Sequence, residues 1–466
     1  DSPSTLRGPL FQSHSSVSCC KSTAFFAFMQ VFLGYVIFLS YLCVVFLKRD
    51  TTSMTKTRKI INDPVFGFLS IPDGLIFRIL QHPYIQRLNR IRQLGLSFFV
   101  YPGAMHSRFL HSLGAMHLMH EAIISLREKG VEITDKEATA SMAAILLHDV
   151  GHGPFSHVFE EAGLLPNDMT HEDISLMMMH QLRDECNDLT DKDIMTMAIA
   201  IFKDEYTKHF LHQLISSQLD VDRLDYLCRD SFFCGVTEGS VASARILKMM
   251  NVKNDRLVVE AKGIYSVEKF LVARRLMYWQ VYLHHTSVAA EQVLIKILER
   301  AKHLTSKGIE LFCSPALNYF LQSSTAHQHI DTTTLLHHYA MLDDSDLLSA
   351  IKVWMNSKDK VLCTLCNCFT NRQLFKGKLL ENPLTANEYD AQCQQYATHL
   401  GVSHEDAKYF FVEHISTSNT YSEKGEAIDI LYKDGTVRDI ANASDMLNME
   451  NLTYKPQKRY LFYMNL

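Results

Sequence analysis

The sequence lacks a large excess of charge of either sign. Its 46 Lys and Arg residues face 51 Asp and Glu residues, which gives a formal net charge of −5. This balance argues against broad electrostatic binding of nucleic acid, although it is compatible with a local basic pocket. Internal repeats and low-complexity tracts are also missing. A chain of 466 residues is too long for one small core, so two lobes are expected.

A paired cysteine framework is lacking as well. The 11 cysteines are odd in number and scattered, and Cys228 and Cys234 stand beside acidic, helix-like sequence. They are expected to be reduced thiols of an intracellular, cytoplasmic protein. "CTLCNC", with Cys363, Cys366 and Cys368, looks like half of a zinc site. No second Cys/His pair follows at zinc-finger spacing and the flanks are helix-periodic, so a packed helix is favoured over a metal site.

The first fifty residues contain an apolar run that stands apart from the rest. Residues 24–47 carry no charge and are followed by Lys48 and Arg49. The run is long enough to span a bilayer, with the cations favouring a cytoplasmic main body. Alternatively, Met54 opens "MTKTRKIINDPVFG" like a natural soluble start, and residues 1–53 would then not belong to the native protein. Membrane anchoring through 24–47 and a non-native segment both stay open.

Helical periodicity dominates from about residue 60 to about residue 300. Apolar residues recur at helical spacing in 75–95 and 109–130, which end in Gly95 and Gly130. Thr134, with Glu137 three residues on, predicts an N-cap for the next helix. Two more long helices are expected over 215–235 and 266–301.

The remainder of the chain mixes helices with strands. Residues 254–263 could form a short hairpin, and helices are expected to continue from about residue 302 to about residue 400. Beyond that, "AKYFFVEHI" and "AIDILYKDGTVRDIA" read as strands, the latter turning at Asp434-Gly435. The predicted fold class is therefore mainly α, with a smaller C-terminal α+β lobe.

A cluster of titratable residues stands where an apolar helix stops. In "LLHDVGHGPFSH", residues 146–157, the run ends in His148-Asp149, followed by His152 and His157. An adjacent His-Asp pair supplies two ligands for a divalent metal, which needs about four from the protein. A buried, hydrogen-bonded His-Asp couple is the alternative for the dipeptide alone.

Two other helices supply residue types that suit the same chemistry. Arg108 and His111 lie three apart on one helix face. "LDVDRLDYLCRD" carries Asp222, Arg223, Tyr226 and Asp230 on one stripe, flanked by leucines and phenylalanines. A solvated helix face would also be charged, but these apolar flanks predict a half-buried wall.

These residues carry a family resemblance. The order His111, His148-Asp149 and Asp222 looks like the metal-binding signature of the HD-domain phosphohydrolases. "DPVFG", "QRLNRIRQLG", "VYPGAMHSRFLHSLG", "HDVGHGPFSHVFE" and "DVDRLDYLCRD" resemble, in this order, the deoxynucleoside triphosphate triphosphohydrolases related to the SAM-and-HD-domain protein and bacterial dGTPases. The resemblance covers roughly residues 60–300 and implies an HD-domain helical core.

The resemblance implies a role for each matching residue. It implies that the divalent metal, which could be Mn, Fe, Mg or Zn, is bound by His111, His148, Asp149 and Asp222. It implies that the triphosphate is contacted by Arg108, His152, Arg223 and Arg274. The proton donor would be His157, oriented by Glu160 and His171. It implies that the sugar is contacted by Gln93, Asp230, Tyr226 and Tyr282, and that Leu94 lies near the base. The implied reaction releases a deoxynucleoside and intact triphosphate from a deoxynucleoside triphosphate (dNTP).

The sequence departs from the SAM-and-HD type at several of these positions. Glu160 replaces an Asp, and Tyr278 stands at a position that is usually His. The family implies homodimers or homotetramers and an allosteric nucleotide. Gln81 and Asn89 replace an acidic and a basic residue at the regulatory site, so activation by a guanine nucleotide does not carry over. No SAM domain precedes the HD lobe.

Three domain segments and two alternative functions follow. Residues 1–53 are unassigned, 54–300 are the expected catalytic lobe, and 301–466 are the helical and α+β lobe. One alternative is a two-metal HD phosphodiesterase acting on a cyclic or dinucleotide substrate, for which His171 and His180 could supply ligands. The other is a nucleotide-binding regulator without catalysis. Nucleic acid is not an implied partner.

Overall fold

The computed structural model describes residues 57–322, 331–417, 427–445 and 456–466. The predicted apolar run 24–47 and the alternative start at Met54 lie outside these residues. Within them, no helix combines the length and the apolar character that a bilayer crossing requires. Thr57–Leu466 form one compact unit, and the division of this unit near residue 300 stays a prediction.

The described chain begins with an antiparallel hairpin that the helical periodicity did not predict. β1 (Thr57–Asp63) pairs with β2 (Gly67–Pro72). The turn forms because Asp63 accepts the backbone N–H groups of Val65 and Phe66, at 2.9 and 2.8 Å. Gly67 closes it with a φ of 77°. The hairpin matters for the site because it holds Asp63 in the interior.

The expected long helix over 75–95 is broken into shorter pieces. α2 (Leu75–Gln81) ends at His82, and α3 (Pro83–Arg87) begins at the proline. His82 is extended because a residue before proline disfavours the helical region. The 3₁₀ turns η1 (Leu88–Arg90) and η2 (Ser97–Phe99) follow. The segment between these turns carries Gln93 and Leu94.

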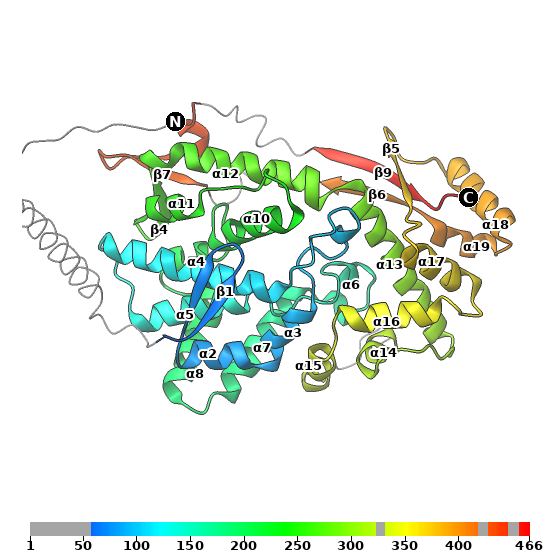
Figure 1. Ribbon diagram of the computed structural model, residues 1–466, viewed down its shortest axis with the longest axis horizontal. Coiled ribbons are helices and arrows are strands. Elements are labelled where there is room, and N and C mark those ends of the chain that lie inside the picture. The colour runs from blue at the N-terminus through cyan, green and yellow to red at the C-terminus, as the bar shows by residue number, and fades with distance from the viewer. Residues whose placement is uncertain (1–56, 323–330, 418–426, 446–455) are drawn as a thin grey trace, which may run out of the picture. The chain divides into compact units, whose positions relative to one another are not determined.

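A group of helices forms the centre of the molecule (Figure 1). α4 (Arg108–Glu128) packs against α5 (Asp135–Leu147) and α10 (Val221–Cys234). The predicted capping box of Thr134 and Glu137 begins α5, and Gly130 and Gly235 follow α4 and α10 with φ of 83° and 69°. The surrounding helices are α6 (Val158–Glu161), α7 (His171–Glu185), α8 (Leu189–Phe202) and α9 (His209–Gln213).

The expected helix over 266–301 is also interrupted. α12 (Ile264–Met277) passes into a π-helical turn, η5 (Tyr278–Tyr282), before α13 (His285–Ser306) begins. Single π turns frequently occur at functional sites. Here the turn separates two helices that face different neighbours: α12 contacts α10, whereas α13 contacts α6, α14 and α17.

The C-terminal part combines helices with two small sheets, as expected. Its helices are α14 (Pro315–Gln322), α15 (Thr332–Ala340), α16 (Asp344–Trp354), α17 (Lys360–Thr370), α18 (Ala386–Leu400), α19 (His404–Ala407), the 3₁₀ turn η6 (Lys408–Phe410) and α20 (Ile440–Ala443). The helix predicted at "CTLCNC" is α17, and Cys366 and Cys368 are buried in it. The candidate metal-binding groups of the described chain include no cysteine.

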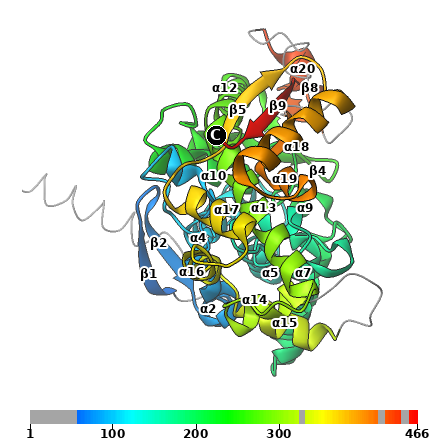
Figure 2. The same cartoon turned by 90° about the vertical axis from the view of Figure 1, so that its right-hand side faces the viewer.

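One of the two sheets is built from the C-terminal part alone, whereas the other joins strands that are far apart in the sequence (Figure 2). β5 (Lys376–Leu380), β9 (Gln457–Tyr463) and β6 (Phe411–Thr417) form one antiparallel sheet, in that order. The hairpin of β3 (Met250–Lys253) with β4 (Arg256–Glu260) joins that of β7 (Asp429–Leu431) with β8 (Val437–Asp439) in the other sheet, since β4 pairs with β7 in parallel. The first hairpin lies earlier than the predicted range 254–263, because residues 254 and 255 form its turn. The mainly α class with a C-terminal α+β part is confirmed.

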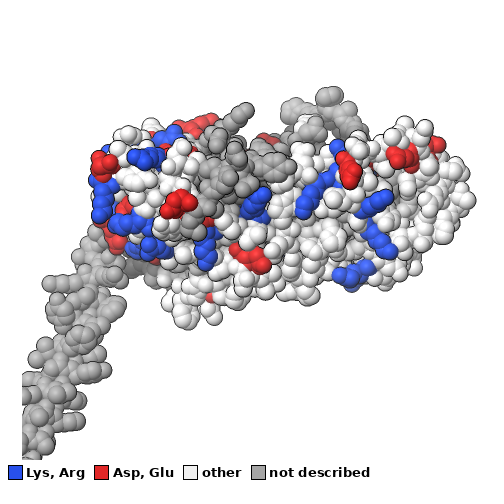
Figure 3. Space-filling view, turned by 90° about the horizontal axis from the view of Figure 1, so that it is seen from above, with Lys and Arg blue, Asp and Glu red and all other residues white. Residues whose placement is uncertain are grey.

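The charged side chains show no broad area of one sign on the face seen in Figure 3. Lys and Arg are interspersed there with Asp and Glu over the described residues. This distribution agrees with the near balance of charges in the sequence.

Candidate active site

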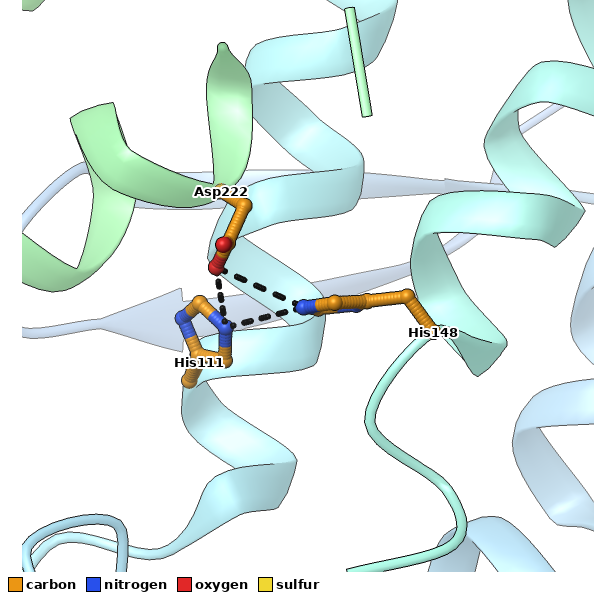
Figure 4. A group of neighbouring side chains, drawn as sticks. All are labelled: His111, His148 and Asp222. Carbon is orange, nitrogen blue, oxygen red and sulfur yellow. Dashed lines mark hydrogen bonds and ion pairs between the residues drawn. The ribbon is translucent and has the colours of Figure 1, made fainter. Parts of the chain in front are cut away.

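The four predicted metal ligands converge from three helical segments. His111 lies on α4, His148 caps the C-terminus of α5 with Asp149 next to it, and Asp222 lies in the first turn of α10. Asp222 Oδ1 is 3.1 Å from His111 Nε2 and 3.4 Å from His148 Nε2. The two imidazole Nε2 atoms are 3.4 Å apart. Figure 4 shows the side chains of His111, His148 and Asp222 pointing toward one another.

This donor set fits a divalent cation. Candidate ligand atoms of His111, His148 and Asp222 all lie within 4.8 Å of one another. Asp149 approaches the same point, with Oδ1 3.4 Å from His148 Nε2 and Oδ2 3.7 Å from His111 Nε2. Imidazole nitrogen and carboxylate oxygen suit Zn, Fe and Mn. HD domains bind divalent metals, and the chemistry of these side chains leaves the identity of the ion open.

The sequence did not predict a buried series of ion pairs behind His111. Asp225 Oδ2 accepts the Nδ1–H of His111 at 2.7 Å, and Arg229 donates to both Asp225 oxygens at 2.9 Å. Arg229 Nη1 also donates to Asp63 at 2.7 Å. Asp225 and Arg229 fit against α4 only because residue 114 is glycine. A Cβ at Gly114 would lie 1.9 Å from Asp225 Oδ1. The spacing of Asp225 and Arg229, four residues apart on one helix, was the available signal.

This chain of charges controls the protonation of the metal-free ligands. Burial lowers the pKa of His111, but hydrogen bonds with Asp222 and Asp225 outweigh burial and raise that pKa to about 10. Burial raises the pKa of Asp222, but hydrogen bonds with His111 and His148 outweigh it and hold the pKa below its usual range. The second nitrogen of His148, Nδ1, lies 2.6 Å from the Ile145 carbonyl oxygen. Both imidazoles therefore turn Nε2 toward the metal site.

The segment after Asp149 requires its glycine. A Cβ on Gly151 would lie 2.1 Å from the carbonyl oxygen of His171. The Gly151 N–H donates to Ser175 Oγ at 2.9 Å, and that hydroxyl donates to the His148 carbonyl at 2.9 Å. α7 therefore packs directly against the residues that follow α5.

Three histidines and a glutamate form a second group beside the metal ligands. The rings of His152 and His171 stack with centroids 3.9 Å apart, and His157 lies 5.3 Å from His171, edge to face. Glu160 Oε1 is 2.9 Å from His171 Nδ1. His152 Nε2 is 3.3 Å from Asp149 Oδ1, which connects the two groups. Burial, followed by the charges of Arg108 and His171, lowers the pKa of His157.

A cavity of about 510 Å³ adjoins both groups. Of the predicted residues, it is lined by Arg108, Gln93, Leu94, Arg223, Tyr226, Asp230, Tyr282, His157 and Asp222. His152, another predicted phosphate contact, is not part of this lining, and neither is Arg274. Its Nη1 donates to Gln218 at 3.3 Å, and its guanidinium lies 5.9 Å from the ring centre of Tyr278.

Two carboxylates, the half-buried Asp149 and the buried Asp220, hold the arginines of the cavity wall. Arg108 Nη1 donates to Asp149 at 2.5 Å, and its Nη2 donates to Ser156 Oγ at 2.7 Å. Arg223 pairs with the fully buried Asp220, which also caps α10 by accepting the backbone N–H of Arg223 at 2.7 Å. Both guanidinium groups are thus held in place at the cavity wall.

Another part of the cavity lining is aromatic and hydrogen-bonded. Tyr282 donates to Asp230 Oδ2 at 2.9 Å, and His106 Nε2 is 2.8 Å from the other oxygen of Asp230. Tyr226 and Tyr278 pack edge to face on Tyr282, with centroids 5.9 and 5.3 Å away. The π turn η5 brings both Tyr278 and Tyr282 to the cavity.

A strained loop closes the cavity and is held by a residue from the C-terminal part. Phe155 and Ser156 both adopt positive φ, 53° and 59°, which L residues rarely do. Asp344, at the start of α16, accepts the N–H of Phe155 at 2.9 Å and that of Arg92 at 3.0 Å. Burial raises the pKa of Asp344 to about 6, although these two backbone hydrogen bonds lower it. No sequence motif pointed to Asp344.

Comparisons with known proteins place this site in a family. A family model described as HD domain matches residues 108–230, and one described as HD associated region matches residues 241–312. The uncharacterized protein YwfO of Bacillus subtilis is 35% identical over 324 residues, which are 68% of this chain and 71% of that protein. A deoxynucleoside triphosphate triphosphohydrolase SAMHD1 homolog of Dictyostelium discoideum is 32% identical over 252 residues, 51% of this chain and 48% of that protein.

A solved structure agrees with the family models. The crystal structure of a phosphohydrolase from Bacteroides thetaiotaomicron VPI-5482 is 53% identical and superposes with a TM-score of 0.83, covering 88% of this chain and 100% of that one. The HD model spans α4 to α10, the helices that carry every candidate metal ligand. The chain therefore belongs to the HD-domain family of metal-dependent phosphohydrolases.

Proposed function

We propose that the protein hydrolyses dNTPs to a deoxynucleoside and inorganic triphosphate. The observation that carries this proposal is the position of the metal ligands: Asp222 lines a cavity whose wall also presents Arg108 and Arg223. A triphosphate carries about four negative charges, so it needs cations as well as a metal. The name of the similar Dictyostelium protein, a deoxynucleoside triphosphate triphosphohydrolase homolog, supports the same substrate class.

A divalent ion held by His111, His148, Asp149 and Asp222 would polarise a phosphoryl group and lower the pKa of a water molecule. Arg108 and Arg223 bind the phosphate oxygens, and the fixed guanidinium groups orient the chain of phosphates. His152 and Arg274 complete the proposed phosphate contacts. The resemblance to the triphosphohydrolases implies reaction at the α-phosphoryl group, because attack there releases intact triphosphate.

His157 is the proposed proton donor to the leaving 5′-oxygen. It lines the cavity, and its neighbour His171 is oriented by Glu160. In the free protein the pKa of His157 is lowered by burial and by the nearby cations. A bound triphosphate adds negative charge beside it and raises that pKa again, so substrate binding favours the protonated imidazole. Proton donation to an alkoxide contributes about 10²–10⁴-fold to the rate.

The sugar is proposed to lie between the tyrosines and Gln93. The side-chain oxygen of Gln93 is buried without a hydrogen-bond partner among the described residues, which suits a hydroxyl donor from a ligand. Asp230 is the second proposed contact of the 3′-hydroxyl. Tyr226 and Tyr282 pack beside it, which favours a sugar without a 2′-hydroxyl. Leu94 is proposed to contact the base.

The proposal is tested by the products. Purified protein is loaded with Mn, Mg or Fe and incubated with dNTPs and NTPs, and the products are separated by anion exchange. We expect intact triphosphate and a deoxynucleoside in equal amounts. Release of only pyrophosphate or orthophosphate would refute the assigned reaction. Binding without any turnover would favour the regulator instead. Light scattering on the same sample tests the proposed homodimer or homotetramer, with and without a nucleotide activator.

A two-metal phosphodiesterase is the second candidate, and one observation favours it. His152, Glu160 and His171 form another group whose candidate ligand atoms lie within 4.8 Å of one another. The predicted contribution of His180 is less suited, because it lies nine residues after His171 on α7, about 13 Å along the helix. A metal content near two ions per chain, reduced to one by His171→Ala, would support this candidate. A metal content near one ion per chain would support the triphosphohydrolase.

A further inference from the structure

One buried histidine connects the two residues that are proposed to contact the 3′-hydroxyl of the sugar. His106 lies in the loop before α4, and its side chain is fully buried. Its Nε2 is 2.8 Å from Asp230 Oδ1 on α10. Its carbonyl oxygen accepts the backbone N–H of Gln93 at 2.9 Å. Gln93 and Asp230 both line the cavity, whereas His106 lies behind them and is not part of the lining.

The imidazole of His106 is the donor in its hydrogen bond with Asp230. A carboxylate offers lone pairs and no proton, so the proton of this hydrogen bond must lie on Nε2 of the ring. The other ring nitrogen, Nδ1, is buried without a hydrogen-bond partner in the part of the chain that the structure describes. A proton on Nδ1 would leave a buried N–H unsatisfied, which is costly. The tautomer with its proton on Nε2 alone therefore fits this environment.

The ring of His106 is held in one orientation by its surroundings. It stacks on Phe233, with the ring centres 4.5 Å apart and an angle of 14° between the planes. Phe233 follows Asp230 by three residues on α10, so the same face of this helix presents the carboxylate and the aromatic ring. A Cβ on Gly103 would lie 2.5 Å from the carbonyl oxygen of Phe233, so the loop packs tightly against the end of α10. Packing therefore fixes the position of Nε2 relative to Asp230.

The carboxylate of Asp230 receives one donor on each oxygen. His106 binds Oδ1, and the hydroxyl of Tyr282 donates to Oδ2 at 2.9 Å. Within the described ranges Asp230 makes no ion pair with Arg or Lys, so these two donors are what holds the carboxylate in its orientation. Each carboxylate oxygen has a further lone pair. Asp230 can therefore still accept a hydrogen bond from a hydroxyl group of a ligand in the cavity.

We propose that His106 is a positioning residue that orients Asp230 for recognition of the 3′-hydroxyl of the substrate. This inference rests on the proposed dNTP hydrolysis, which assigns Asp230 and Gln93 to the sugar. His106 itself does not contact the substrate: its imidazole acts through the carboxylate, and its carbonyl oxygen fixes the backbone of Gln93. Without the imidazole donor, Asp230 is held through one oxygen only. The preference for substrates that carry a 3′-hydroxyl then falls.

The first test compares matched nucleotides on the unmodified, metal-loaded protein. dATP is paired with 2′,3′-dideoxy-ATP and dGTP with 2′,3′-dideoxy-GTP, so the members of each pair differ only in the 3′-hydroxyl. We expect kcat/KM to favour the dNTP by about 10- to 100-fold, the range of a hydrogen bond to a charged group. Equal kcat/KM values within both pairs would overturn the inference while leaving dNTP hydrolysis in place.

The second test separates the hydrogen-bond donor from the packing of the ring. His106→Leu and His106→Gln both lose the stacking on Phe233, but only the Gln side chain can still donate to Asp230. We expect the preference for the 3′-hydroxyl to fall toward one in His106→Leu and to return in His106→Gln, with metal content unchanged. An unchanged preference in His106→Leu, or equal losses in both variants, would overturn the inference. His404→Leu is the control, because His404 pairs with Asp390 at 3.0 Å outside the cavity.

A double-mutant cycle tests whether His106 acts through Asp230. The preference for the 3′-hydroxyl is measured in His106→Leu, in Asp230→Ala and in the double variant. Because the imidazole is proposed to act only through the carboxylate, His106→Leu should have no further effect once residue 230 is alanine. Additive losses would show that His106 acts by another route and would contradict its positioning role. Should His106→Leu fail to fold, His106→Asn, whose amide is one methylene shorter than that of Gln, replaces it.

Equilibrium binding separates this inference from the proposed hydrolysis. The dissociation constants of dGTP and 2′,3′-dideoxy-GTP are measured on the metal-loaded protein and on His106→Leu. A preference for dGTP that depends on His106, without triphosphate release, would retain the positioning role and refute hydrolysis. Triphosphate release without such a preference would do the reverse, and no binding of any dNTP would refute both.

Discussion

The fully buried Asp225 offers a sharp test of how the metal site is built. Its carboxylate holds the Nδ1–H of His111 at 2.7 Å and both donors of Arg229 at 2.9 Å. In Asp225→Asn the amide oxygen can still accept from His111, but the negative charge is lost and the amide N–H₂ faces a cation. The substitution therefore changes electrostatics and orientation with little change of volume.

Two separate effects are expected from Asp225→Asn. Loss of an outer carboxylate behind a ligating histidine typically weakens metal binding by about 10- to 100-fold. Breaking a buried ion pair costs about 3–5 kcal/mol of stability, and the lower end applies here because Arg229 keeps Asp63 at 2.7 Å. The dissociation constant is measured by titrating chelator-treated protein with Mn, and the free energy of unfolding by urea denaturation.

Asp359→Asn is the matched control. Arg300 binds Asp359 through Nε and Nη2, at 3.0 and 2.6 Å, the same two-point geometry that Arg229 makes with Asp225. The control should lose stability without a change in metal affinity. If Asp225→Asn lost stability but bound Mn as tightly as the parent, Asp225 would be a structural residue and its proposed effect on His111 would be wrong.

The remaining predictions concern the ligands, the proton donor, the loop anchor and the ion itself. His111→Ala and Asp222→Ala should each abolish bound metal and turnover, whereas His157→Ala should keep the metal and lose about 10²–10⁴-fold in kcat; full turnover of His157→Ala would assign proton donation to another group. Burial raises the pKa of Asp344 to about 6 in the folded protein, above its ordinary value of 3.8. The folded state therefore binds an extra proton between these values, and the contribution of Asp344 to stability falls as pH rises from about 4 to about 6. The stability of Asp344→Asn relative to the parent should therefore rise across this window in urea titrations, and a constant difference would contradict the shift. Removing the ion with a chelator should lower the melting temperature, and Mn at 100 times its dissociation constant should restore about 2.7 kcal/mol; identical melting curves would argue against ion binding.

The predictable part of the site was the part carried by local spacing. His148 and Asp149 stand at the end of α5 because Thr134 and Glu137 begin that helix, and both signals are short-range. Such signals identified the candidate metal ligands but not the distances between them, which depend on the packing of three separate helices. The family resemblance supplied the roles of residues far apart in the sequence.

Long-range contacts explain what the sequence did not predict. Asp344 contacts the loop at Phe155 across 189 positions, and no periodicity encodes such a pairing. The first hairpin was not predicted, although its turn has a local sequence signal: Asp63 precedes Pro64 and accepts the backbone N–H groups of Val65 and Phe66. The helix over 266–301 was predicted as continuous because the π turn η5 does not interrupt the apolar pattern.

The ion-pair chain and the loop anchor bear on what counts as the smallest working unit of this enzyme. The HD model begins at residue 108 and ends at residue 230, yet Asp63 precedes it, and Tyr282 and Asp344 follow it. A fragment cut at those limits would contain every predicted metal ligand. It would still leave Arg229 with one carboxylate fewer, Asp230 without its tyrosine and the Phe155 N–H without its acceptor. Protein engineers who transplant such a module should therefore carry the flanking segments along with it.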